Sequence, residues 1–182
     1  MIHTLTSRLL SISMIVLAVL TVGCEGAGAP LGEADEVPVN PDVIGSWYAS
    51  GEEEGDAGLW LRVWAFNDSE YYVEWEGEEE DDDLARLRVF ASDLGTYLFA
   101  NVQCINCDED DRKEWFFFQY EFESPDVLLI RGIEDEHYSD AMSQMSDSRD
   151  VRRYVERHMG DTGFFSEDVL RMTQYVAEEA TD

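Results

Sequence analysis

The sequence predicts a mainly β domain that ends in a helical region (α+β), with an antiparallel meander that curls into a small barrel. Three observations predict it. Short segments between residues 43 and 134 alternate apolar and polar residues with a period of two. Turn-forming residues separate these segments at short intervals, and the period changes to that of a helix after residue 134. Connections this short favour hairpins over long crossovers.

The alternation within the expected strands assigns their two faces. Leu59, Leu61 and Val63 share one face of their segment, whereas Trp60, Arg62, Trp64 and Phe66 share the other. Turn signals such as Asn67-Asp68-Ser69 and Ser124-Pro125-Asp126 separate neighbouring segments. The expected strands are 43–48, 59–66, 71–76, 84–92, 96–104, 114–123 and 127–134.

The C-terminal part reads as helical before a last strand. Residues 148–159 place Val151, Tyr154, Val155, His158 and Met159 on one helical face. Asp147 or Ser148 is the expected N-cap, and Gly160 the expected C-cap. We expect a helix over 137–144 and a strand over 170–175 that returns to the sheet; a short helix over 169–177 is the alternative.

The first 24 residues have the layout of a secretory leader. Arg8 precedes an apolar run over 9–20, and small residues lead to Cys24. This stretch resembles a bacterial lipoprotein signal, although Thr21 stands where that family usually has Leu. The resemblance implies that residues 1–23 are removed, that Cys24 is lipidated, and that the protein is held on the periplasmic side of the cell envelope, in the inner or the outer membrane. A plain secretory signal and an uncleaved anchor are the alternatives; the run is shorter than the roughly 20 residues of a membrane-spanning helix.

Residues 24–42 are expected to form a flexible tether, and residues 43–182 the folded domain. The segment 25–42 is rich in Gly, Ala, Glu and Pro and has no periodic apolar pattern. Such a tether would hold the domain away from the bilayer.

The composition limits the partners. The chain has 41 acidic and 12 basic residues, a formal net charge of −29 at pH 7. A surface this acidic repels nucleic acid and anionic lipid. Aromatic residues at 12% and apolar residues at 45% indicate a packed core.

Gly45-Ser46-Trp47 opens the first expected strand. This triplet resembles the Gly-x-Trp start of lipocalins, and the resemblance implies that Trp47 plugs one end of a barrel. A core tryptophan on an edge strand is the alternative. Side chains alone can fill an eight-stranded barrel, so a filled interior is favoured over one that holds an apolar ligand.

Cys104 and Cys107 form a C-x₂-C pair at the end of a strand. A structural disulfide is favoured, because an oxidising compartment permits it. Free thiols and a metal or redox site remain open, although Asp108, Glu109, Asp110 and Asp111 would raise the thiol pKa and disfavour redox work.

Four arginines lie on the polar face of the expected helix: Arg149, Arg152, Arg153 and Arg157. They either offset acidic loops of the same molecule or form a docking face for anionic lipid headgroups or a partner.

No recognised catalytic or phosphate-binding motif occurs in the sequence. The acidic runs at 52–54, 78–83 and 108–111 lack the spacing of an EF-hand calcium loop. The expected function is therefore a non-enzymatic binding or interaction domain without a cofactor or metal, held at the membrane through Cys24. Its partner would be an envelope protein. A lipocalin-like carrier of an apolar small molecule is the alternative.

Overall fold

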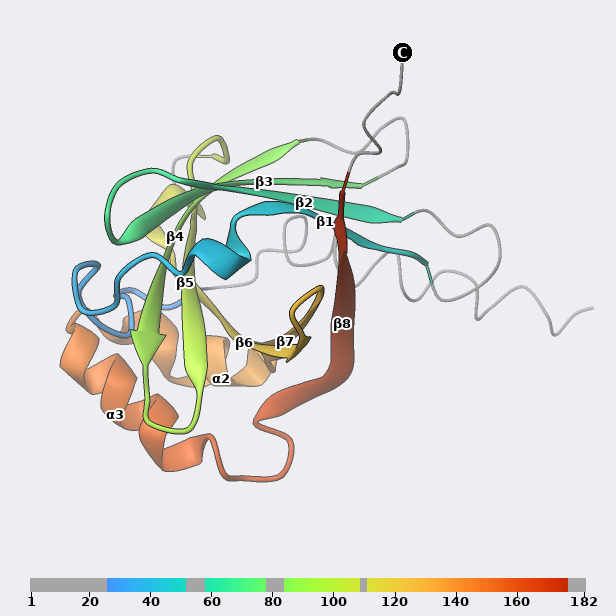
Figure 1. Ribbon diagram of the computed structural model, residues 1–182. Coiled ribbons are helices and arrows are strands. Elements are labelled where there is room, and N and C mark those ends of the chain that lie inside the picture. Colours follow the sequence, from blue (N-terminus) through green and yellow to red (C-terminus); the bar gives the residue numbers. More distant parts are fainter. Residues whose placement is uncertain (1–25, 52–57, 78–83, 109–110, 177–182) are drawn as a thin grey trace, which may run out of the picture.

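The computed structural model describes residues 26–51, 58–77, 84–108 and 111–176. Eight antiparallel strands form a closed barrel in simple chain order (Figure 1). The strands are β1 (Gly45–Ala49), β2 (Leu59–Ala65), β3 (Glu70–Gly77), β4 (Ala85–Asp93), β5 (Leu98–Cys104), β6 (Phe116–Ser124), β7 (Val127–Ile133) and β8 (Phe165–Tyr175). The predicted meander and its closure into a small barrel are confirmed.

The last strand closes the sheet. β8 pairs with β7 through residues such as Leu128 and Met172, and it pairs with β1 through Trp47 and Gln174. The strand expected over 170–175 therefore exists and begins earlier, at Phe165. Because closure leaves no unpaired sheet edge, Trp47 does not lie on an edge strand.

Short helices precede the barrel, lie between β5 and β6, and lie between β7 and β8. They are the 3₁₀ helix η1 (Pro41–Val43), the 3₁₀ helix η2 (Asp111–Lys113), α2 (Asp135–Asp140), the 3₁₀ helix η3 (Met142–Gln144) and α3 (Ser148–His158). Asp147 is the N-cap of α3, as one of the two expected candidates, because its side chain accepts a hydrogen bond from the Arg149 amide. The expected C-cap is wrong by one residue, since Met159 holds that position and Gly160 follows it.

Side chains fill the interior of the barrel. The paired positions alternate as expected, so that one face of every strand points inward. Trp47, Leu128 and Met172 are almost completely buried there. Residues Leu61, Val63, Tyr71, Val73, Leu87, Val89 and Tyr120 belong to the same cluster.

A second core lies outside the barrel, on the outer wall of β4, β5 and β6. Phe90, Phe99 and Phe117 point outward from these strands, and Val151 and Val155 of α3 are fully buried against the same cluster. In Figure 1, α3 lies beside this wall at the lower left, and β1, β2 and β3 lie at the top. One side of the barrel is therefore covered, and no described residue forms such a layer on the opposite side, which we call the open side.

Residues 26–34 complete this second core, which differs from the tether expected over 24–42. Ala27 and Leu31 are fully buried in it. The Ala27 amide donates to the Trp115 carbonyl at 2.8 Å, and the Trp115 amide donates back to Ala27 at 2.9 Å. The Leu31 amide donates to the buried side chain of Asn101 at 2.7 Å. We call residues 26–31 the N-terminal clamp.

The N-terminal clamp lies close to neighbouring segments because Gly26 and Gly28 have no side chains. A Cβ atom on Gly28 would lie 2.7 Å from the Met145 carbonyl oxygen, and one on Gly26 would lie 2.7 Å from Cβ of Glu114. Real Cβ atoms do not approach other atoms this closely. The composition that suggested flexibility therefore serves close packing instead.

None of the helices in the described ranges has both the length and the apolarity needed to cross a bilayer.

We predict that Leu31→Ala lowers the free energy of unfolding by about 2–4 kcal/mol, because it opens a cavity in a fully buried site. Denaturant titration of residues 24–182 measures this loss. Asp35→Ala, at an exposed position four residues away, is the control and should change stability by less than about 0.5 kcal/mol. Equal stability of the Leu31→Ala variant and the unchanged protein would show that the clamp does not contribute to the folded state.

Candidate interaction surface

The open side of the barrel carries a set of aromatic side chains that are exposed or half-buried. Outward positions alternate along β2, so Trp60 and Trp64 point away from the interior with Arg62 between them. Neighbouring strands add further rings at outward positions. We call this set the aromatic wall: Tyr48 of β1, Trp60 and Trp64 of β2, Tyr72 of β3 and Tyr175 of β8.

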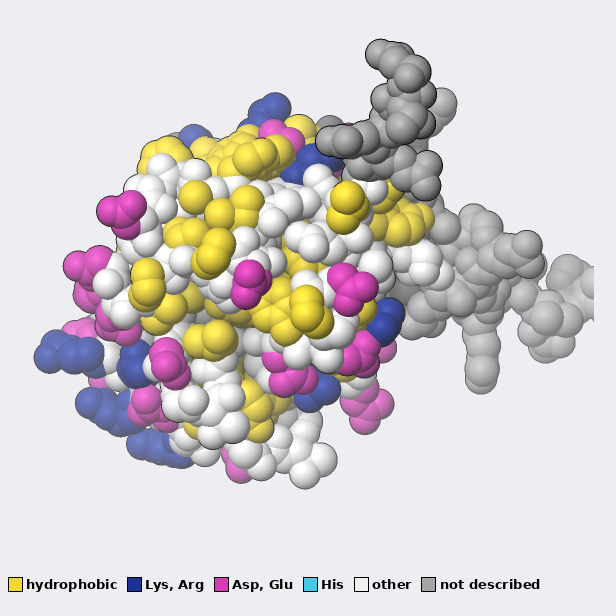
Figure 2. Space-filling view, viewed as in Figure 1, with side chains coloured by type: hydrophobic (Ala, Val, Ile, Leu, Met, Phe, Trp, Pro, Cys, Tyr) yellow, Lys and Arg dark blue, Asp and Glu magenta, His cyan; other side chains and the backbone are white. Residues whose placement is uncertain are grey.

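The rings of the aromatic wall contact one another in two groups. The centroid of Trp60 lies 4.8 Å from that of Tyr48 and 5.2 Å from that of Tyr175. Trp64 and Tyr72 form the second pair, with 5.7 Å between centroids. Trp64 is 43% exposed and Tyr175 is 55% exposed, so large ring faces meet solvent. Figure 2 shows hydrophobic side chains gathered at the top of the view, over β2 and β3.

Ion pairs run between the strands of this wall. Arg62 donates to Glu76 on β3 at 2.6 Å, and its guanidinium carbon lies 5.8 Å from the centroid of Trp60. On the neighbouring strands, Arg86 lies 4.0 Å from Glu74. Charged side chains of both signs therefore lie beside the aromatic rings of the wall.

Glu70 is the most buried carboxylate of this region. Its side chain accepts hydrogen bonds from Arg88 Nε and from the Asn67 amide group, each at 2.7 Å. Burial alone would raise the pKa of Glu70, but the hydrogen bonds from Arg88 and Asn67 outweigh it and lower the pKa below 4.5. The ionised form is therefore the one that the fold stabilises.

Gly45 and Trp47 lie in β1. Trp47 is fully buried among the interior side chains, and its indole Nε1 donates to the Val43 carbonyl at 2.9 Å. Gly45 has a φ of 142°, in the region that favours glycine. Trp47 thus packs beside η1, which precedes β1 at this end of the barrel.

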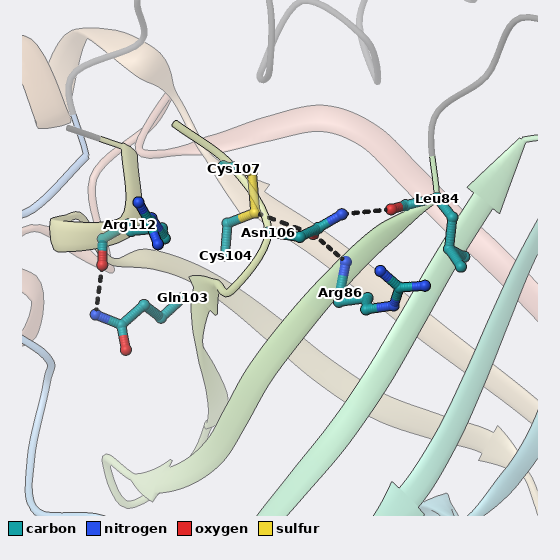
Figure 3. The surroundings of a disulfide bond; sticks show 7 residues. All are labelled: Leu84, Arg86, Gln103, Cys104, Asn106, Cys107 and Arg112. Atoms are coloured by element: carbon teal, nitrogen blue, oxygen red, sulfur yellow. Dashed lines mark hydrogen bonds between the residues drawn. A yellow bond between two sulfur atoms is a disulfide. The ribbon is translucent and has the colours of Figure 1, made fainter. Parts of the chain in front are cut away.

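Cys104 and Cys107 are joined by a disulfide, with an S–S distance of 1.93 Å. Between them, the Asn106 side chain accepts a hydrogen bond from the Arg86 amide at 2.7 Å and donates to the Leu84 carbonyl at 2.8 Å (Figure 3). The disulfide loop is therefore fastened to the start of β4. This geometry favours the structural interpretation over free thiols or a redox pair.

The four arginines of α3 are not equivalent. Arg152 donates to Glu36 at 3.1 Å and to the Asp93 carbonyl at 2.7 Å, so it ties the helix to two other segments. Arg149 pairs with the nearby Asp147 and Arg153 with the nearby Asp150, and both arginines are exposed. Arg157 is exposed as well. Arg152 therefore contributes to the fold, whereas Arg149, Arg153 and Arg157 form an exposed basic strip.

The two histidines of the domain lie together beside α3. His137 Nδ1 lies 3.0 Å from the Tyr154 hydroxyl, and His158 Nδ1 lies 2.9 Å from an Asp161 carboxylate oxygen. Within the described ranges, no group of three or more His, Cys, Asp or Glu side chains is arranged to hold a metal ion.

A shallow depression lies on the outer wall of β6, β7 and β8. It is lined by Gln119, Glu121, Arg131 and Val169, among others, and has a volume of about 170 Å³ open to solvent. This is smaller than a typical pocket for a small ligand, about 300–1,000 Å³.

Several predicted features lie outside the described residues. They are the leader, Cys24, and the acidic runs at 52–54 and 78–83.

Comparison of the chain with protein-family models finds no match, and comparisons with curated proteins and with solved structures likewise find none. The likeness to lipocalins is thus one of fold kind, a small eight-stranded antiparallel barrel.

We predict that Glu70→Gln lowers the free energy of unfolding at neutral pH by about 1–3 kcal/mol, because charge-assisted hydrogen bonds are lost. The lowered pKa means that Glu70 contributes its full stabilisation above pH 4.5 and loses it as the pH falls through the folded-state value. Denaturation from pH 7 to pH 3 should therefore show the two proteins converging in acid. Glu121→Gln, at an exposed site, is the control, and a pH-independent difference would contradict the assignment.

Proposed function

We propose that this chain is a bacterial envelope lipoprotein, anchored through Cys24, whose barrel is a non-enzymatic binding domain for an envelope protein. The aromatic wall is the contact surface. The observation that carries the proposal is that the exposed rings of Trp64 and Tyr175 pack on half-buried aromatic rings, on the open side of a barrel whose interior is already filled.

The residue types of the wall support a protein partner. Trp, Tyr and Arg are the residues most enriched at the energetic centres of protein interfaces, and the wall combines all three around Arg62. Ring-to-ring contacts such as that between Trp60 and Tyr48 hold the surface in place before binding, which reduces the ordering entropy lost on association. Because the barrel is closed, a partner would be recognised by side chains and not by strand addition.

The disulfide supports placement outside the cytoplasm. Structural disulfides persist in oxidising compartments such as the periplasm, and Cys104 and Cys107 are joined by one. This agrees with the secretory leader, and Cys24 is the third cysteine of the chain.

The carrier alternative needs a pocket that the described residues do not provide. The interior positions are occupied by Trp47, Met172 and their neighbours, and the depression on the outer wall is shallow and lined by polar residues such as Gln119 and Arg131. The binding domain is therefore the better-supported proposal.

The anchor is tested by Cys24→Ala. We expect the unchanged protein to carry the mass of a lipid and to float with membranes, and the variant to appear in the soluble envelope fraction without that mass. Intact-protein mass spectrometry and flotation measure both. A variant that remained in the membrane fraction would refute anchoring through Cys24.

The contact surface is tested by site-specific photo-crosslinking in intact cells. A photoreactive residue at position 64 should give a discrete crosslinked protein, whereas the same residue at position 105 should not. Ile105 is a matched control because it is also an exposed apolar residue, at 46% exposure, outside the wall.

The affinity of the crosslinked protein then measures the contribution of the rings. Trp60→Ala should weaken binding by about 30-fold, which corresponds to about 2 kcal/mol for a central interface residue. Ile105→Ser should bind as the unchanged protein does. If the Trp60→Ala and Ile105→Ser variants bound equally well, the aromatic wall would not be the contact surface.

A further inference from the structure

We infer that the anchored domain lies directly on the bilayer, with α3 and the N-terminal clamp against the lipid headgroups and the aromatic wall facing away. This inference rests on the proposed anchor at Cys24. It concerns how the N-terminal clamp positions the domain relative to the anchor. The sequence alone predicted that the clamp residues belong to a flexible tether.

The clamp begins almost at the anchor. The Gly26 amide donates to a Glu114 carboxylate oxygen at 2.9 Å, and Ala27 exchanges two backbone hydrogen bonds with Trp115. Gly26 is two positions after Cys24, and two steps along the chain span at most about 7 Å when fully extended. A lipid on Cys24 therefore holds residue 26, and the barrel fastened to it, within that distance of the bilayer surface.

The clamp also determines which side of the barrel is held there. The Gly28 amide donates to the Met142 carbonyl at 3.1 Å, and Gly28 packs against Met145, three residues before α3 begins. Ala27 and Leu31 share the second core with Val151 and Val155 of α3. The clamp and α3 thus cover the same wall, that of β4, β5 and β6, with the N-terminal segment beside α3 in Figure 1.

The basic side chains on this side of the barrel belong mainly to α3, and they can attract anionic headgroups. Within α3, four arginines stand against two acids, Asp150 and Glu156, in a chain whose net charge is −29. The side chains of Arg149 and Arg153 are 84% and 64% exposed. Figure 2 shows Lys and Arg side chains gathered at the lower left, over α3.

Other charges also face this side. Arg112 and Lys113 are exposed immediately before Glu114, which receives the Gly26 amide, and Asp147 caps α3 beside Arg149. Basic side chains at a membrane surface are attracted by anionic lipid, and acidic ones are repelled. Glu36, beside Arg152, and Asp135 and Glu136 of α2 also lie on this side. Among the described elements, α3 carries the strongest basic excess, so its exposed arginines are the groups through which anionic lipid would attract this side.

Fluorescence quenching at two single-cysteine sites tests the orientation. Ser146→Cys lies just before α3, and Thr173→Cys lies on the outward face of β8 beside Tyr48; both positions are exposed. With the Cys104–Cys107 disulfide intact and Cys24 lipidated, a thiol-reactive fluorophore labels only the new cysteine. The full lipidated protein is reconstituted in phosphatidylcholine–phosphatidylglycerol vesicles that carry a nitroxide at the headgroup.

We expect headgroup quenching to be several-fold stronger at position 146 than at position 173. Equal quenching at the two positions, or stronger quenching at 173, would overturn the inference while leaving the anchor intact. Absence of the lipid mass on Cys24 would instead overturn the proposed anchor, and the inference with it. Mass spectrometry of the same sample separates these two failures.

A longer connection provides the matched variant. Insertion of about ten Gly and Ser residues between Glu25 and Gly26 adds a flexible reach of about 17 Å and leaves every contact of the clamp in place. Quenching at position 146 should then fall toward the value at position 173. If the insertion left the quenching unchanged, the short connection would not be what holds α3 at the bilayer.

Discussion

The pairing of β8 with β1 is the contact on which the other features of this domain depend. It closes the sheet, so the interior becomes a sealed core around Trp47 and Met172. It also brings Tyr175 within 5.2 Å of Trp60, which joins residues from opposite ends of the chain into one aromatic surface. Without that pairing, β1 and β8 would be free edges that invite aggregation, and the aromatic wall would be divided.

Much of the fold follows from local patterns. The alternation in segments such as 59–66 correctly placed Leu61 and Val63 on one face and Trp60 and Trp64 on the other, since a strand has a period of two whatever it packs against. The clamp could not be found in this way. Its glycines are required by Met145 and Glu114, which are more than 80 residues away in sequence, and no local pattern distinguishes a glycine needed for close packing from one that confers flexibility. The outward phenylalanines of β4, β5 and β6 were the available signal that something covers that wall.

The candidate site, like the fold, was only partly predictable from the sequence. The sequence indicated that the two tryptophans of β2 share one face, but the contact of Trp60 with Tyr175 of β8 requires barrel closure. The arginines of α3 were visible as a strip, yet only the structure separates Arg152, which binds Glu36 and the Asp93 carbonyl, from the exposed Arg149 and Arg153. The type of a side chain can be read directly from the sequence. The residue that it contacts in the fold usually cannot.

The burial of Ala27 and Leu31 has a consequence for the order in which the chain folds. These residues are synthesised before any strand of the barrel, but their partners are Asn101, Trp115 and the helix that contains Val151. Contacts between residues so distant in sequence form late, because the intervening chain must be ordered first. The earliest described segment of the chain is thus among the last to reach its place, and its docking completes the second core.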